Sequence, residues 1–387
     1  MRIGLMNKNT YILDAEFNEE IKTFTNIYEI KNIEYAPLVI YNKYKKDKDI
    51  LKVVNEWFKG RGIPTFRDSL DLLLAKLGID SQYDLLDESF GLSLSDQYWI
   101  KPFDSNIQYK DINFFEHDFD DTEFTNATFS DEVCNTKISL ISPNNTTDGR
   151  LKKTWIIDNK KRYLLKGAYK NEVMQPFNEV LGSMICDRLN IEHTTYTLDI
   201  VNDKVVSKCE CFINTNTELV TAHQILSETE DKENAYEEYI KILIDNGIKD
   251  CRNKLEDMFL LDYLILNEDR HLNNFGIIRD VNNLKWLSIA PIYDNGQSLN
   301  IIDYTDDELI INGKGRFFYK VESFDNIIKI IKDINKYDLT KLDGVVEEFD
   351  LLLHKYQYIT NMTDRRINKI CILLMSRINK LKSIQNN

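Results

Sequence analysis

Three polar side chains in the last third of the sequence have a spacing that suits phosphoryl transfer. Asp269 and Asn274 lie five positions apart, and Asp294 follows twenty residues later in Asp294-Asn-Gly296. A carboxylate can accept the proton of an attacking hydroxyl. A carboxamide and a second carboxylate supply the hard oxygen ligands that hold Mg²⁺ against the phosphates of ATP. The pattern predicts Asp269 as the catalytic base, and Asn274 and Asp294 as the metal ligands.

The neighbours of these residues suggest supporting roles. Arg270 could steady either a phosphate or a nearby carboxylate. We interpret His271 as structural, because a ring at such a position more often holds a loop by hydrogen bonds than transfers protons. Gly296 would allow a backbone turn that a bulky side chain would resist.

A lysine at the end of a predicted strand is the candidate cation for this chemistry. In the strand 162–166, Lys166 shares one face with Leu164, so its ammonium could neutralise the phosphates of ATP. A strand-end lysine that reaches solvent is the alternative. The following helix begins at Pro176 and carries Glu179 on a face of small residues, which we expect to approach a sheet closely. Glu179 is therefore placed to pair with Lys166, with Glu172 as a second candidate and an exposed first-turn glutamate as the alternative reading.

Two further segments are candidates for contacts with the nucleotide. A strand over 136–142 runs into the polar segment 143–153, whose backbone could cover phosphates. The predicted contacts there are Thr147, Asp148, Gly149 and Lys152. A plain hairpin loop explains the same pattern equally well. A later hairpin ends at Glu210, Cys211 and Phe212, and their backbone would hydrogen-bond adenine.

The pattern of apolar residues predicts an α+β protein in three parts. Residues 1–130 form an amino-terminal α/β module without visible chemistry, with short strands that include 36–41. Residues 131–213 form a small, strand-rich lobe that binds the nucleotide. Residues 214–387 form a helical lobe in which a buried helix over 255–266 delivers Asp269 into its loop. Residues 300–314 are polar and acidic, which fits an activation or substrate loop.

Composition restricts the possible partners. The formal net charge is −14, which disfavours direct binding to nucleic acid or to anionic membranes. Six cysteines show neither CxxC pairs nor metal-ligand spacing, so we expect buried free thiols. The first residues contain no signal-peptide pattern and no apolar run reaches membrane-spanning length, so we expect a cytoplasmic protein.

The order Lys166, Glu179, Asp269-Arg-His-Leu-Asn-Asn274 and Ala290-Pro-Ile-Tyr-Asp294 resembles the HipA-like serine/threonine kinases of bacterial toxin–antitoxin systems. Phosphatidylinositol kinases share a similar Asp-Arg-His-x-x-Asn order. The resemblance covers about 135 to 387 and implies a bilobal protein-kinase-like fold. It also implies that Lys166 anchors ATP, Asp269 is the base, and Asn274 and Asp294 hold Mg²⁺. HipA-like enzymes can autophosphorylate a serine near the nucleotide loop, for which this sequence offers Ser142, Thr146 or Thr147.

The function expected from these observations is a protein kinase that transfers the γ-phosphate of ATP to a protein hydroxyl. Such a kinase would have a protein substrate, and the resemblance adds an antitoxin-like protein partner. Two alternatives remain. One is a lipid or small-molecule kinase with the same catalytic groups, and the other is a nucleotide-binding pseudokinase that acts as an interaction module.

Overall fold

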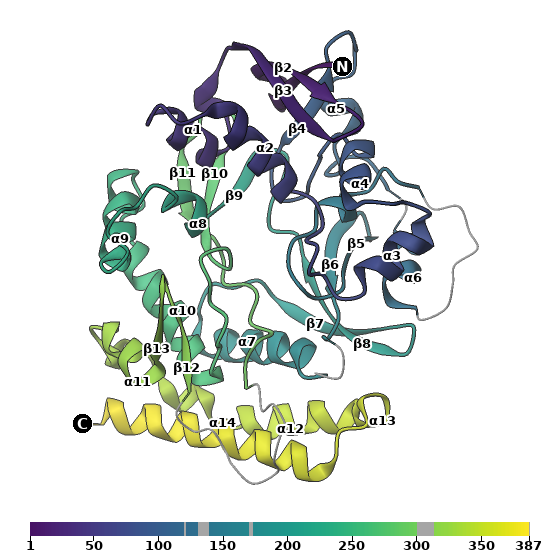
Figure 1. Ribbon diagram of the computed structural model, residues 1–387. Coiled ribbons are helices and arrows are strands. Elements are labelled where there is room, and N and C mark those ends of the chain that lie inside the picture. The colour runs from purple at the N-terminus through teal and green to yellow at the C-terminus, as the bar shows by residue number, and fades with distance from the viewer. Residues whose placement is uncertain (120, 131–138, 170–172, 300–312, 387) are drawn as a thin grey trace. The chain divides into compact units, whose positions relative to one another are not determined.

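The protein is described here by a computed structural model that covers residues 1–119, 121–130, 139–169, 173–299 and 313–386 (Figure 1). The residues group into two compact units, each built from three segments of the chain. Unit one contains Met1–Leu165, Glu210–Glu230 and Ile277–Ser288. Unit two contains Lys166–Cys209, Asp231–Gly276 and Ile289–Asn387. The division into 1–130, 131–213 and 214–387 stays a prediction.

Unit one begins with an antiparallel sheet in the order β3-β2-β1-β4. Its strands are β1 (Arg2–Asn7), β2 (Thr10–Asn18), β3 (Thr23–Ile30) and β4 (Tyr98–Pro102). Leu5 pairs with Leu13 on one side and with Ile100 on the other, so alternate apolar residues fall on one face. The helices α1 (Leu38–Tyr44) and α2 (Ile50–Gly60) contribute to the same core.

The predicted strand over 36–41 is wrong, because this stretch enters helix α1. Pro37 occupies the N-cap of α1, and Leu38 and Ile40 are buried in the core. Proline is tolerated at a helix start, where the missing N–H would have no helical partner. A short apolar run of this length does not by itself distinguish a strand from a helix.

The rest of unit one contains short helices and two smaller groups of strands. Its helices are α3 (Leu70–Leu77), α4 (Gln82–Glu88), α5 (Tyr109–Ile112), α6 (Thr122–Phe129) and α8 (Ala222–Ile225). The strands β9 (Thr217–Thr221), β10 (Gly276–Asp280) and β11 (Trp286–Ile289) form a sheet in the order β11-β10-β9. Buried Arg279 of β10 donates to Glu218 of β9 at 2.6 Å and to the Tyr98 hydroxyl of β4 at 3.1 Å. This network links the two sheets.

The segment before Lys166 differs in part from the prediction. Strands β5 (Lys153–Asp158) and β6 (Lys161–Lys166) form as expected, with the turn residues Asn159 and Lys160 at positive φ. Residues 136–138 of the strand predicted over 136–142 lie outside the described residues, and its described part, 139–142, is not a strand. A 3-10 helix, Pro143–Thr146, follows it and is capped by the Ser142 side chain.

Unit two is mostly helical. Its helices are α7 (Gln175–Leu189), α9 (Ala235–Asp245), α10 (Cys251–Ile265), α11 (Phe324–Ile327), α12 (Val345–Lys355), α13 (Gln357–Thr360) and α14 (Asp364–Gln385). Two antiparallel hairpins accompany them: β7 (Tyr196–Val201) with β8 (Lys204–Glu210), and β12 (Lys314–Phe317) with β13 (Lys320–Ser323). Helix α10 is buried along most of its length and packs against α14, α7 and α9.

Among the described helices, none combines the length and the apolar character that crossing a bilayer would require.

Candidate active site

Helix α10 places the predicted catalytic loop. The helix ends at Ile265, and Leu266 adopts a left-handed conformation with φ +52° that turns the chain out of the helix. Buried Asn267 then donates to Asp262 at 2.9 Å and accepts from the backbone N–H of Asp269 at 3.1 Å. The loop is therefore tied to the helix that precedes it, as the sequence predicted for Asp269.

Arg270 joins the catalytic loop to the loop that carries Asp294. Its fully buried guanidinium is paired with Asp262, with an N–O distance of 2.8 Å. One of its nitrogens, Nη1, donates to the backbone carbonyls of Asn274 at 3.1 Å and Tyr293 at 2.6 Å. Of the two roles predicted for Arg270, the structure supports the contact with a carboxylate. Removing one partner of such a buried pair costs about 3–5 kcal/mol.

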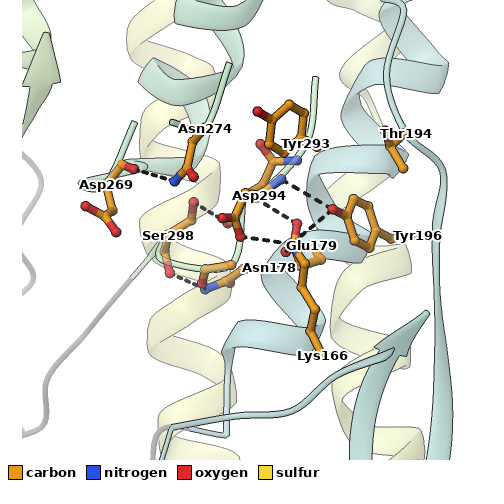
Figure 2. A network of polar contacts seen from close by, with 12 residues as sticks. Lys166, Asn178, Glu179, Thr194, Tyr196, Asp269, Asn274, Tyr293, Asp294 and Ser298 are labelled. Carbon is orange, nitrogen blue, oxygen red and sulfur yellow. Dashed lines mark hydrogen bonds and ion pairs between the residues drawn. The ribbon is translucent and has the colours of Figure 1, made fainter. Parts of the chain in front are cut away.

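Lys166 lies between two carboxylates. Its ammonium is 2.8 Å from Glu179 Oε1 and 2.9 Å from Asp294 Oδ1, and it contacts the Tyr196 hydroxyl at 3.2 Å (Figure 2). The expected Lys166–Glu179 ion pair is present, and both side chains are buried. The alternatives of a solvated lysine and an exposed glutamate are wrong. Glu172, the second candidate for the pair, lies outside the described residues.

Burial and charge act in opposite directions on this pair. Burial opposes the charged form of Lys166, but the carboxylates of Asp294 and Glu179 outweigh it, so the pKa of Lys166 is raised well above its ordinary value. Burial raises the pKa of Glu179, and the charge of Lys166 acts against this effect. The ammonium is therefore held in its charged form at neutral pH, as phosphate binding requires.

The strained residue in the second loop is Asp294 and not the glycine. Asp294 has φ +59°, a left-handed conformation that is uncommon for non-glycine residues, although Asp adopts it more readily than most. Its backbone N–H donates to the Tyr196 hydroxyl at 3.3 Å. Gly296 has no positive φ, and a Cβ added there would make ordinary contacts at 3.4 Å with Gln175. The role predicted for Gly296 is wrong in this respect.

Helix α7 approaches this loop through its small residues. The backbone N–H of Asn295 donates to Glu179 Oε2 at 2.7 Å, and the Asn295 side chain accepts from Arg270 at 2.6 Å. A Cβ added to Gly182 would lie only 2.9 Å from Asn295 Nδ2. The face of small residues therefore meets this loop, and it also approaches strand β7 as expected, because the Ser183 hydroxyl accepts from the Tyr196 N–H at 2.9 Å.

Asp269 and Asn274 lie next to each other in the catalytic loop, with Asp269 partly exposed and Asn274 buried (Figure 2). The Asn274 amide donates to the Asp269 carbonyl at 2.9 Å. The Asp269 carboxylate is partly exposed and accepts from Arg316 Nε at 3.1 Å. His271 Nδ1 accepts from the backbone N–H of Asn273 at 3.2 Å, so its ring holds the loop as expected.

The segment predicted to cover phosphates lies in unit one and is anchored there. The hydroxyl of buried Thr147 accepts from Arg67 at 3.1 Å and donates to the Asn144 carbonyl, while Arg67 Nε donates to the Gly149 carbonyl at 2.7 Å. Burial lowers the pKa of Arg67 to about 10, which leaves it charged at neutral pH. Asp148 is exposed and Lys152 half-buried.

Each of the three hydroxyls considered for autophosphorylation takes part in a hydrogen bond within the protein. Ser142 is buried and accepts from the backbone N–H of Asn144 at 3.2 Å. Thr146 donates to the Leu92 carbonyl at 2.9 Å, and Thr147 is held as described above. Phosphorylation at any of them would require this segment to open.

The predicted adenine contacts also lie in unit one. The Cys211 N–H donates to the Arg162 carbonyl at 2.8 Å, which commits this donor to the protein backbone. The Glu210 side chain pairs with Lys161 at the surface. The roles of Glu210, Cys211 and Phe212 in binding adenine stay predictions.

Sequence reasoning missed three residues of this assembly. Asp262 falls within a helix that reads as apolar, and nothing in its spacing marks it as the partner of Arg270. Tyr196 begins a strand, where an aromatic residue is ordinary. Arg316 follows Asp269 by 47 positions, too far for a local pattern to connect them.

Neither a family model nor a curated protein matches the sequence. Among solved structures, a chain of the HipA–HipB toxin–antitoxin complex with operator DNA from Shewanella oneidensis MR-1 aligns with a TM-score of 0.53 and 13% identity. That alignment covers 100% of this chain and 99% of the other. The proinflammatory kinase CtkA from Helicobacter pylori aligns over 60% of this chain and 93% of its own, with 20% identity and a TM-score of 0.48. The chain has the mixed α+β fold of the HipA kinase over its full length.

Proposed function

We propose that this protein is a Mg²⁺- and ATP-dependent serine/threonine protein kinase that transfers the γ-phosphate of ATP to a protein hydroxyl. The observation that carries the proposal is the buried Lys166 ammonium, held by Glu179 and Asp294 in the unit that also contains Asp269 and Asn274. Building a charged lysine into a protein interior is costly, so its retention favours a functional role. The fold shared with HipA is consistent with this chemistry.

The residues that would hold a metal ion fit Mg²⁺. The Asn274 amide nitrogen is committed to the Asp269 carbonyl, which directs Oδ1, a neutral oxygen ligand, away from that bond. Asp294 adds a charged oxygen ligand that is partly exposed. The described residues contain no cluster of three or more His, Cys, Asp or Glu able to hold a metal. Mg²⁺ commonly takes one or two carboxylate ligands and completes its shell with phosphate oxygens and water, so this small set suffices.

The chain itself would supply position and charge for the reaction. Lys166 would hold the phosphates of ATP, with Glu179 fixing the ammonium. Asp269 would orient the acceptor hydroxyl and take its proton as the oxygen attacks the γ-phosphorus and the bond to the bridging oxygen of ADP breaks, releasing ADP. Bound Mg²⁺ would neutralise charge that develops on the phosphate oxygens. Arg270 would act as a positioning residue, because it bonds to the backbone of both loops.

The contacts with the rest of ATP are part of the proposal. Backbone groups around Thr147, Asp148 and Gly149, with the ammonium of Lys152, would cover the phosphates. Backbone groups of Glu210 to Phe212 would meet adenine, with the Cys211 N–H excluded by its existing bond.

The decisive experiment measures transfer of labelled phosphate from ATP to a mixture of protein substrates. We expect transfer by the wild type with Mg²⁺, none after chelation, and a loss of at least about a hundredfold in D269A and D294A. D245A is the matched control, because Asp245 is an exposed carboxylate at the end of α9 in the same unit. Equal labelling in all four proteins would refute the proposal.

The same assay separates the alternatives. Labelling of lipid or small-molecule hydroxyls in place of proteins would identify a lipid or small-molecule kinase with the same catalytic groups. Tight ATP binding without transfer at saturating Mg²⁺ would identify a pseudokinase that serves as an interaction module.

An antitoxin-like protein partner remains a prediction for this chain, because assembly with HipB and DNA is known here only for the similar protein. Purification of the native protein from its own cells, followed by mass spectrometry of stoichiometric companions, tests it. We expect one small companion protein, and a chain that migrates alone would contradict the prediction.

A further inference from the structure

The β12–β13 hairpin presents a fixed face beside the predicted base. Phe317 and Phe318 anchor it in an aromatic cluster with Tyr236, Phe259 and Phe275, with ring centroids 5.1–6.5 Å apart. The backbone N–H of Arg316 also donates to the Glu268 carbonyl at 3.2 Å, directly before Asp269 in the chain. The hairpin is thus tied to both the helical core and the catalytic loop.

The outward face of this hairpin is basic. Lys314 and Arg316 lie two positions apart on β12 and so point to the same side, and both are exposed. Arg316 pairs in register with Val321 of β13, which is 67% exposed. Gly315 occupies the opposite side, where an added Cβ would lie 2.9 Å from the Asn267 carbonyl. The inner side is therefore closed by the protein, and the outer side carries two cations and an apolar residue.

The Arg316–Asp269 pair occupies Oδ1, one of the two Asp269 oxygens that could receive an acceptor hydroxyl. The guanidinium side chain is 54% exposed and the carboxylate 42% exposed, with 3.1 Å between Nε and Oδ1. Exposed ion pairs contribute little and exchange readily with other partners. An acceptor hydroxyl that binds Oδ1 displaces the guanidinium, and a carboxylate near that hydroxyl offers the guanidinium a new partner.

We propose that the Lys314–Arg316–Val321 face is the docking surface for acceptor polypeptides with an Asp or Glu next to the phosphorylated Ser or Thr, and that Arg316 determines this specificity. The inference rests on the proposed kinase function and adds the class of substrate. An acidic side chain would bind the Arg316 guanidinium as the acceptor hydroxyl takes its place on Asp269. Arginine suits this exchange, because its planar fork binds carboxylates in a bidentate manner.

The acidic character of the whole chain does not oppose this local attraction. The net charge is −14, but charges further than about 10 Å are largely screened at 0.1 M salt. Lys314 and Arg316, the two cations of this face, lie within that distance of an acceptor that binds there. Assays at this ionic strength examine the local effect and suppress the long-range repulsion.

The test uses the full chain and three degenerate peptide libraries with a central Ser or Thr, in which the flanking positions are fixed as Glu, Gln or Lys. We expect the wild type to prefer the Glu library over the Gln library by about tenfold in kcat/KM, the size of one charge-assisted contact. R316Q should abolish the preference, and R316E should reverse it in favour of the Lys library. K320Q is the control, because Lys320 lies on the same hairpin but pairs with Glu233.

The outcomes separate the inference from the function on which it rests. A library preference that is absent in the wild type, or unchanged in R316E, overturns the inference while the kinase function stands. A higher KM for ATP in R316Q, with no change for the peptides, overturns it as well and assigns Arg316 to the nucleotide. If no library and no protein is labelled in a manner that D269A abolishes, the kinase function itself fails.

Discussion

Lys166 shows that a single buried side chain can form ion pairs with residues that lie far apart in the sequence. Its carboxylate partners follow it by 13 and 128 positions. The nearer pair could be predicted from the sequence, because strand alternation and helix periodicity fix the faces of Lys166 and Glu179. The contact with Asp294 could not, because no local rule specifies which loop closes over a strand end.

A substitution at Lys166 should destabilise the protein, because it leaves buried Glu179 without its cation. We expect K166M to lower the free energy of unfolding by about 3–5 kcal/mol in urea titrations. K161M is the matched control on the same strand, because Lys161 and its partner Glu210 are both exposed. A loss below about 1 kcal/mol in K166M would show that the pair is not intact in solution.

The same pair predicts a pH dependence. The pKa of Lys166 is raised in the folded state, through the carboxylates that overcome its burial. A raised pKa of a base adds stability that is fully present below the unfolded value of about 10.5 and is lost as pH rises through the folded value. The stability difference between the wild type and K166M should therefore not fall between pH 7 and pH 10, and it should decrease above that range. A difference that falls already between pH 7 and pH 9 would contradict this assignment.

At the scale of elements, the position of helix α7 depends on the missing side chain of Gly182 as well as on the carboxylate of Glu179. Gly182 leaves room for Asn295, which bonds to both Glu179 and Arg270. A glycine within a helix usually costs about 1 kcal/mol relative to alanine. Here that cost is offset by the close approach of the loop that contains Asp294.

Replacing this glycine should therefore reverse the usual effect of alanine in a helix. We expect G182A to destabilise the protein by about 1–3 kcal/mol through the clash with Asn295 Nδ2 at 2.9 Å, and to reduce phosphoryl transfer. G60A at the end of α2 is the control, because an added Cβ meets nothing within 4 Å there and should be neutral or stabilising. Urea titration of both variants decides between a steric effect and the intrinsic preference.

Elements with their own local signals were the most predictable from the sequence. The hairpin of β10 and β11 and the helix α7 were expected because turn residues and Pro176 mark their ends. The roles of Asp269 and Asn274 rest on a motif contained in one loop, which is why their proximity could be predicted. Arg316 comes from a distant element, and only tertiary packing brings it to that loop, as it brings Tyr196 to Lys166 and Asp294.

At the scale of the molecule, each unit is assembled from three separate stretches of chain. The sequence suggested consecutive parts because composition and periodicity are read along the chain, whereas the units are defined by contacts between remote segments. In unit one, the buried Arg279–Glu218 pair and the Tyr98 hydroxyl connect strands from all three of its segments. Such pairs, rather than local propensity, hold the segments of a unit together.

Disruption of the network of Arg279, Glu218 and Tyr98 should destabilise mainly unit one. We expect R279M to leave Glu218 buried without a cation and to raise amide hydrogen exchange in β4, β9 and β10, while α10 in unit two keeps its protection. K166M should show the reverse pattern, with faster exchange in α7 and the loop around Asp294. Uniform acceleration across the chain in both variants would show that the two units unfold as one.

The long separation between Lys166 and Asp294 also bears on biosynthesis. At roughly 5–20 residues per second, a ribosome needs about 6–26 s to add the 128 residues between them. For most of that interval the nascent chain has Lys166 and Glu179 but lacks the second carboxylate, so a chain that ends before Asp294 cannot complete the ion pairs of Lys166.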